Sequence, residues 1–155
     1  MSISVPKQGG WTFKVQDVPG NGNCMFESVG RTAGIPAPEL RRQVVTWMKQ
    51  PNRKLHDVNL SDWIEWNTGK TLPHYVSQMS RNGEWGTGIE LATMATILNC
   101  AIVVYGRDGA GMAKRLAEFL PSSAPNPAEL PAICVLYVNN NHYMQLIPIV
   151  PKTTA

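Results

Sequence analysis

The chain has 155 residues, of which 43% are hydrophobic, and its 14 lysines and arginines against 11 aspartates and glutamates give a formal net charge of +3. This length suits one domain with a substantial core, so we predict a single domain over residues 1–155 with its core at about 11–150. The charge is too small to predict nucleic-acid binding, and the basic residues, Arg41 and Arg42 among them, are scattered in a way that indicates a solvated surface.

The apolar runs are much shorter than the roughly 20 residues of a transmembrane helix. The first residues, MSISVPKQGG, contain no hydrophobic signal core. We therefore expect no membrane association, and we predict a soluble, monomeric protein of the cytoplasm, or of the host cytoplasm if the source is a virus.

Residues 11–18 alternate between apolar and polar side chains and predict a strand. A glycine-rich turn follows, and a short helix begins at about Cys24 and ends near Gly30 or Gly34. Residues 36–51 carry apolar side chains at helical spacing and predict a second helix.

Residues 51–83 give weaker signals and predict a helical, partly mobile excursion. It contains Trp63 and Trp66, which form either an exposed patch for a protein partner or the buried face of a short helix; we expect one of them in the core. Residues 88–99 predict a clearer helix, which leads into a buried strand at 100–106.

Residues 106–131 predict mostly a loop, in which we allow a short helix at 112–120. Two closing strands, 132–138 and 143–150, are joined by an asparagine turn. Helices before and between strands, with a late hairpin, predict the α+β fold class, with a small central β-sheet flanked by helices.

Three cysteines at positions 24, 100 and 134 make an odd count with wide gaps, which predicts neither a disulfide framework nor a zinc site, and we expect no metal. Cys100 and Cys134 each lie beside an apolar strand, so we expect small buried residues. Cys24 differs, because it lies between a flexible turn and the first turn of a helix.

A thiol at a helix N-terminus is stabilised as the thiolate by the helix dipole and by unpaired amides. The turn before Cys24 contains Asn21, Gly22 and Asn23, whose backbone N–H groups can converge on one point. Such donors suit an oxyanion, with about 3–4 kcal/mol for each well-placed donor in known cases.

A cysteine nucleophile needs a base, usually histidine. His56 and His74 lie in the polar middle of the chain, where a surface position is expected, whereas His142 opens a buried strand after a tight turn. We therefore predict a pair of Cys24 and His142, against the alternative of a structural cysteine and a turn histidine.

Four ordered stretches carry a family resemblance: PGNGNCMFESV, LRRQVVTWM, EWGTGIELATMATILNCAIVVY and CVLYVNNNHYMQLIP. Together they resemble the cysteine loop, the following helix, the tryptophan–glycine segment and the histidine hairpin of the ovarian tumour (OTU) family of cysteine proteases. The resemblance implies a papain-like fold that removes ubiquitin or a ubiquitin-like modifier from conjugates without a cofactor. It also implies that Cys24 is the nucleophile, His142 the base, Trp85 an aromatic residue beside the cleft, and Glu90 part of a structural helix.

Two positions depart from that pattern. Asn21 stands where the family usually has aspartate, although asparagine tolerates the same turn conformations. Met144 stands where the family usually has the third member of the triad, and methionine cannot accept a charge-assisted hydrogen bond. We expect Asp17 to orient His142 instead, unless it is merely a turn-capping or surface carboxylate.

Three other interpretations of the site remain open. The asparagines at 139–141 could supply a side-chain carbonyl to His142, although a tight hairpin explains most of them. The site could work as a dyad, since thiols are intrinsically nucleophilic. The domain could also be an inactive module that binds ubiquitin.

We therefore predict a thiol isopeptidase, a deubiquitinase with no nucleic-acid partner. The compact form and the unusual third position suggest a divergent viral or bacterial member, and in a virus it could also cut a polyprotein. Nucleic-acid binding through the arginines is a further alternative, which the dispersed charge disfavours.

Overall fold

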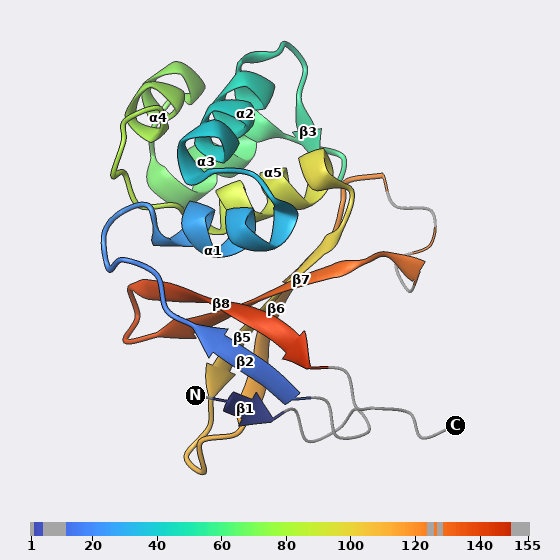
Figure 1. Ribbon diagram of the computed structural model, residues 1–155. Helices are drawn as coiled ribbons and strands as arrows, with labels where there is room; N and C mark the ends of the chain where they lie inside the picture. Colours follow the sequence, from blue (N-terminus) through green and yellow to red (C-terminus); the bar gives the residue numbers. More distant parts are fainter. Residues whose placement is uncertain (1, 5–11, 124–125, 127–128, 150–155) are drawn as a thin grey trace.

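The computed structural model of the chain describes residues 2–4, 12–123, 126 and 129–149. The helices gather on one side of a twisted sheet, and α1 lies directly against it (Figure 1). In chain order the elements are β1 (Ser2–Ser4), β2 (Thr12–Gln16), α1 (Cys24–Ala33), α2 (Ala37–Lys49), β3 (Lys54–Leu55), β4 (Val58–Asn59), α3 (Leu60–Thr68), α4 (Leu72–Met79), α5 (Gly88–Leu98), β5 (Ala101–Arg107), β6 (Ala113–Phe119), β7 (Ala132–Val138) and β8 (His142–Ile149).

The main sheet has six strands in the order β1-β2-β8-β7-β5-β6, and β3 and β4 form a separate small hairpin. Within the main sheet β5 and β7 pair in parallel, and the other neighbours pair antiparallel. The predicted α+β class with a central sheet flanked by helices is therefore confirmed.

The sheet has a core on each face. On the helical side Phe26, Leu40 and Val135 are completely buried between the helices and the strands. On the other face the rings of Phe13 and Tyr105 lie 5.5 Å apart, although β8 and β7 separate their strands. Three strand spacings would place them roughly 14 Å apart in a flat sheet, so the sheet curls around this second core.

Turn chemistry explains why α1 begins and ends where the sequence predicts. The Cys24 N–H donates to the Asn21 carbonyl, which closes the turn before the helix. Gly34 ends α1 in the left-handed conformation, and its N–H donates to the Gly30 carbonyl. The nucleophile candidate is thus the first residue of a well-bounded helix.

The predicted helix at 112–120 is wrong, because these residues form β6. A turn held by Asp108, whose side chain accepts from the N–H groups of Ala110 and Met112, folds this segment back onto β5. The segment AKRLAEF is rich in good helix formers, but pairing along β5 overrides that propensity.

The helical prediction for 51–83 is confirmed by α3 and α4, whereas the short β3–β4 hairpin was not predicted. Its partial mobility stays a prediction. Trp63 is half-buried and its indole N–H donates to the Leu55 carbonyl, while Trp66 is 67% exposed, so only Trp63 joins the core. Strand β1 was not predicted, and two predicted strand residues, Trp11 and Val150, lie outside the described residues.

No helix in the described part of the chain is long and apolar enough to span a lipid bilayer.

Candidate active site

Cys24 begins α1 and is only 1% exposed. Its thiol donates to the Asn141 carbonyl, with 3.9 Å between sulfur and oxygen, so the nucleophile candidate lies against the hairpin that carries His142. The structure thus brings Cys24 and the histidine hairpin together from positions 117 residues apart.

The nucleophile loop, residues 20–23, is held by its asparagines. The Asn23 N–H donates to the Asn21 side-chain oxygen at 3.0 Å, and the Cys24 N–H donates to the Asn21 carbonyl at 3.2 Å. Asn21 therefore supplies the turn that the resemblance assigns to aspartate. Among the described residues the Gly22 N–H has no acceptor, so it stays available as an oxyanion donor, whereas the N–H groups of Asn23 and Cys24 are occupied.

A second loop, residues 82–86, packs on the nucleophile loop; we call it the Trp85 loop. Gly22 and Gly83 touch so closely that a Cβ on Gly22 would lie 1.5 Å from the Gly83 carbonyl oxygen. The Asn23 side chain accepts from the Gly83 N–H at 3.1 Å and donates to the Asn82 side chain at 3.0 Å. The two loops therefore form one unit.

His142 donates from Nε2 to Asp17 Oδ1 over 2.8 Å, because an ionised carboxylate can only accept. This leaves Nδ1 as the basic nitrogen of the neutral ring. Nδ1 is buried without a hydrogen-bond partner in the described structure, and it lies 3.9 Å from the point where a Gly20 Cβ would be. The free base therefore faces the nucleophile loop.

Asp17 follows β2 directly and is largely exposed. Its hydrogen bonds with His142 and with the Val18 N–H lower the pKa of this carboxyl below 3.8, with His142 the larger cause. The carboxylate is therefore ionised at neutral pH and holds the Nε2 proton in place. Asp17 has a partner, which a mere surface carboxylate would lack.

Met144 does not take part in this contact, because it packs in the second core with Leu136 and Leu146. In the β2–β8 register Gln16 lies opposite Gln145, so the next pair along the two strands would be Asp17 and Met144. The acid thus lies one strand away from the position where the family resemblance expects it.

The asparagine turn serves mainly the hairpin. Asn139 and Asn140 have positive φ angles of 56° and 58°, and the Asn141 N–H donates to the Val138 carbonyl. Across the described residues their side chains make no hydrogen bond with His142, whose Nε2 is taken by Asp17. Only the Asn141 backbone carbonyl reaches the site, at the Cys24 sulfur.

Trp85 is 46% exposed in its loop. The next residue, Gly86, lies against Met25, since a Cβ there would be 2.5 Å from the Met25 sulfur. Trp85 therefore lies near the start of α1, in the loop setting expected of a cleft wall. Its role as that wall stays a prediction.

Glu90 is completely buried in α5 and carries no chemistry at the site. It accepts from the Tyr75 hydroxyl at 2.7 Å and closes a capping box with Thr87. Burial raises the pKa of Glu90, and burial beside Glu90 raises the pKa of Tyr75. The structural role that the resemblance implied for Glu90 fits these contacts.

The largest difference from the sequence prediction concerns Arg41, which is 5% exposed instead of solvated. Its guanidinium bonds to both the nucleophile loop and the Trp85 loop. The sequence gives no sign that Arg41 is buried, since the next residue, Arg42, is an arginine that is exposed. The carbonyls that bind Arg41 come from distant segments.

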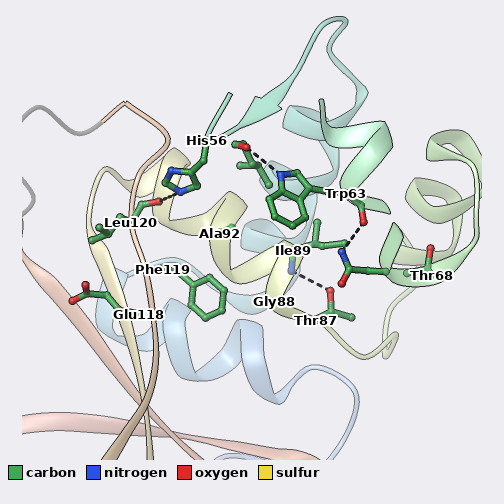
Figure 2. Close-up of a pocket in the computed structure, with 12 residues that line it drawn as sticks. His56, Trp63, Thr68, Thr87, Gly88, Ile89, Ala92, Glu118, Phe119 and Leu120 are labelled. Atoms are coloured by element: carbon green, nitrogen blue, oxygen red, sulfur yellow. Dashed lines mark hydrogen bonds between the residues drawn. The ribbon is translucent and has the colours of Figure 1, made fainter. Parts of the chain in front are cut away.

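A pocket of about 550 Å³ lies elsewhere, between α3, the start of α5 and the end of β6 (Figure 2). Phe119, Ile89 and Trp63 form its apolar lining, and Cys24, His142 and Asp17 are absent from its lining. His56, at its edge, contacts the Leu120 carbonyl at 3.1 Å, as Figure 2 shows. This cavity is therefore separate from the thiol site.

Residues 19–143 match the family model described as OTU-like cysteine protease. The chain belongs to this family. The match covers the nucleophile loop, the Trp85 loop and His142, so the resemblance seen in the sequence is confirmed. Asp17 lies just before the matched residues.

Relatives and solved structures extend this result. A protein of Invertebrate iridescent virus 3, "Putative ubiquitin thioesterase 232R", is 28% identical in an alignment that covers 88% of this chain. The chain matches 16%, 11% and 44% of the lengths of three curated relatives, and so spans less than half of each.

Two solved structures share the fold. The OTU domain of OTUD1 is 19% identical with a TM-score of 0.69, covering 87% of this chain and 85% of that one. An ovarian tumor domain in complex with ubiquitin is 19% identical with a TM-score of 0.68, covering 95% and 76%. The predicted papain-like OTU fold is thereby confirmed.

Proposed function

We propose that this OTU-like domain is a thiol isopeptidase that removes ubiquitin, or a ubiquitin-like modifier, from lysine side chains. The observation that carries the proposal is His142, whose Nε2 is fixed by Asp17 at 2.8 Å while its buried Nδ1 faces the nucleophile loop. This is the arrangement that a thiol nucleophile needs from its base and from the group that orients the base.

In the first half-reaction the Cys24 proton passes to His142 Nδ1, and the thiolate attacks the carbonyl carbon of the isopeptide bond. The carbonyl oxygen becomes an oxyanion that the unoccupied Gly22 N–H can stabilise. His142, now an imidazolium held by the Asp17 carboxylate, gives its Nδ1 proton to the lysine nitrogen. The C–N bond breaks, and the amine leaves a thioester on Cys24.

In the second half-reaction His142 Nδ1 takes a proton from water, and the resulting hydroxide attacks the thioester carbonyl. The C–S bond breaks, the proton on His142 returns to Cys24, and the modifier leaves as a C-terminal carboxylic acid that loses its proton to solvent to become a carboxylate. Asp17 stays ionised throughout, because the hydrogen bond from His142 keeps its pKa low.

The choice of ubiquitin as the modifier rests on the relatives. The iridescent-virus protein is named as a putative ubiquitin thioesterase, and the structural neighbour is described in complex with ubiquitin. Polyprotein cleavage, a cytoplasmic location and a monomeric state stay predictions.

One observation favours the second candidate, a ubiquitin-binding module without turnover. Cys24 is 1% exposed. Its thiol donates to the Asn141 carbonyl, and among the described residues it makes no hydrogen bond to His142. An active enzyme must therefore move the histidine hairpin slightly as substrate binds, which is common when catalytic hydrogen bonds tighten only in the complex.

Hydrolysis of ubiquitin that carries a fluorogenic amide at its C-terminus tests the proposal. We expect turnover by the wild type and its loss in both Cys24→Ala and His142→Ala, with Cys134→Ala as the matched cysteine control that keeps it. Binding of ubiquitin without turnover would instead support the module, and turnover by Cys24→Ala would refute the assigned nucleophile.

A further inference from the structure

Arg41 is a buried cation in α2 whose acceptors come from three separate segments. Its Nη2 donates to the Gly22 carbonyl at 3.2 Å, the Asn23 side-chain oxygen at 2.7 Å and the Glu84 carbonyl at 2.8 Å. Its Nη1 donates to the Met79 carbonyl at 3.0 Å. One side chain thus joins the nucleophile loop, the Trp85 loop and the end of α4.

These partners are unusual for a buried charge, because most of them are backbone carbonyls. Among the described residues no carboxylate makes an ion pair with Arg41. The guanidinium instead lies 4.3 Å from the centre of the Phe26 ring, in the first turns of α1. Burial lowers the pKa of Arg41, while the charges of Glu90 and Glu84 act to raise it.

Burying a cation without a paired carboxylate costs several kcal/mol, which the hydrogen bonds must offset. The guanidinium of arginine carries five N–H donors, so one side chain can bond to acceptors from several segments at once. A lysine ammonium is a point charge with three donors on a flexible stem, so it cannot hold the same four oxygen acceptors.

The bond to the Gly22 carbonyl also fixes the plane of the Gly22–Asn23 peptide, one residue before the peptide that leads into Cys24. In a trans peptide the carbonyl and the following N–H point in opposite directions. With the Gly22 carbonyl held by Arg41, the Asn23 N–H points to the other side, where it meets the Asn21 side chain. Arg41 therefore helps to hold the turn in which the Gly22 N–H has no acceptor among the described residues.

We propose that Arg41 is a positioning residue, which locks the nucleophile loop to the Trp85 loop and so positions the Gly22 N–H, the oxyanion donor, together with the Trp85 loop. It touches neither the substrate nor the reacting atoms. Its effect on turnover rests on the proposed function, whereas its effect on the two loops does not.

Hydrogen exchange followed by mass spectrometry tests the effect on the loops. In Arg41→Lys we expect the amides of residues 20–24 and 82–86 to exchange at least tenfold faster than in the wild type, with α5 unchanged. Arg42→Lys is the matched control, since Arg42 is the next residue, is exposed and pairs with Glu39 on its own helix. Equal exchange in both variants, or a uniform increase over the whole chain, would overturn the proposal.

Turnover provides the second readout. With the fluorogenic ubiquitin substrate we expect Arg41→Lys to lower kcat about 30-fold, with KM changed less than about threefold, because misplaced oxyanion donors act on the transition state. Arg42→Lys should stay within twofold of the wild type. A kcat loss that only follows a loss of folded protein, seen as a lower Tm with unfolding at the assay temperature, would overturn the proposal.

The outcomes separate the two proposals. If the wild type shows no turnover, the proposed function fails, and the exchange experiment alone decides the role of Arg41. If Arg41→Lys does not fold, Asn23→Ala replaces it, because this change removes one acceptor of Arg41 and the partner of the Gly83 N–H. Faster exchange confined to the same two loops would then support the proposal, and unchanged exchange would overturn it.

Discussion

Asp17 Oδ1 lies 2.8 Å from His142 Nε2, across 125 residues of sequence. The acid comes from the end of β2, beside the strand position held by Met144. Because neighbouring antiparallel strands place opposite residues on the same face, a carboxylate on β2 can reach the imidazole that a carboxylate on β8 would otherwise reach. Asp17 thus supplies to His142 the carboxylate that position 144 does not provide.

Replacing Asp17 with asparagine should lower kcat about 10- to 100-fold, because the amide no longer stabilises the imidazolium or its tautomer. Steady-state hydrolysis of the fluorogenic ubiquitin substrate measures this. Met144→Leu, which changes a packing residue, should stay within twofold and serves as the control. Equal activities for wild type and Asp17→Asn would show that the site works as a dyad.

The lowered pKa of Asp17 predicts a pH effect on stability. A carboxyl whose pKa is lower in the folded than in the unfolded chain adds stability that is present above the unfolded value and is lost as the pH falls through the folded value. The difference in unfolding free energy between wild type and Asp17→Asn should therefore have its full value at about pH 5 and decrease as the pH falls below 3.8. Chemical denaturation at several pH values measures it; a difference that stays constant through this range would contradict the prediction.

Gly22→Ala should disrupt the junction of the two loops, because the added Cβ would lie 1.5 Å from the Gly83 carbonyl oxygen. We expect a fall in Tm and a loss of activity of about 100-fold or more. Gly109→Ala is the matched control, since a Cβ there meets nothing within 4 Å. Wild-type activity and Tm in Gly22→Ala would show that the loops are not packed as described.

The burial of Cys100 and Cys134 raises the pKa of each thiol to about 11. At pH 8 only about 0.1% of either is thiolate, so both should resist iodoacetamide in the folded protein and react after unfolding in denaturant. Peptide mass spectrometry measures the labelling. Fast labelling of either residue in the folded chain would contradict its role as a small core residue.

The sequence predicts those parts of the site that depend on local chemistry. Glycine and asparagine mark the turn before Cys24 and the hairpin before His142. Asp17 can be predicted as the orienting acid because it follows a strand beside the nucleophile loop. The burial of Arg41 could not be predicted, because its acceptors come from segments far apart in the chain. Strand β6 could not be predicted either, since its residues favour a helix and only its pairing with β5 decides otherwise.

The most direct test of the central claim is reaction with ubiquitin that carries a thiol-reactive warhead at its C-terminus, followed by intact-mass and peptide mass spectrometry. We expect the wild type to gain one ubiquitin, attached at Cys24, with strong slowing in His142→Ala and no adduct in Cys24→Ala. An adduct on Cys100 or Cys134, or none on a folded wild-type protein, would contradict the assignment of Cys24 and His142 as a ubiquitin-directed thiol site.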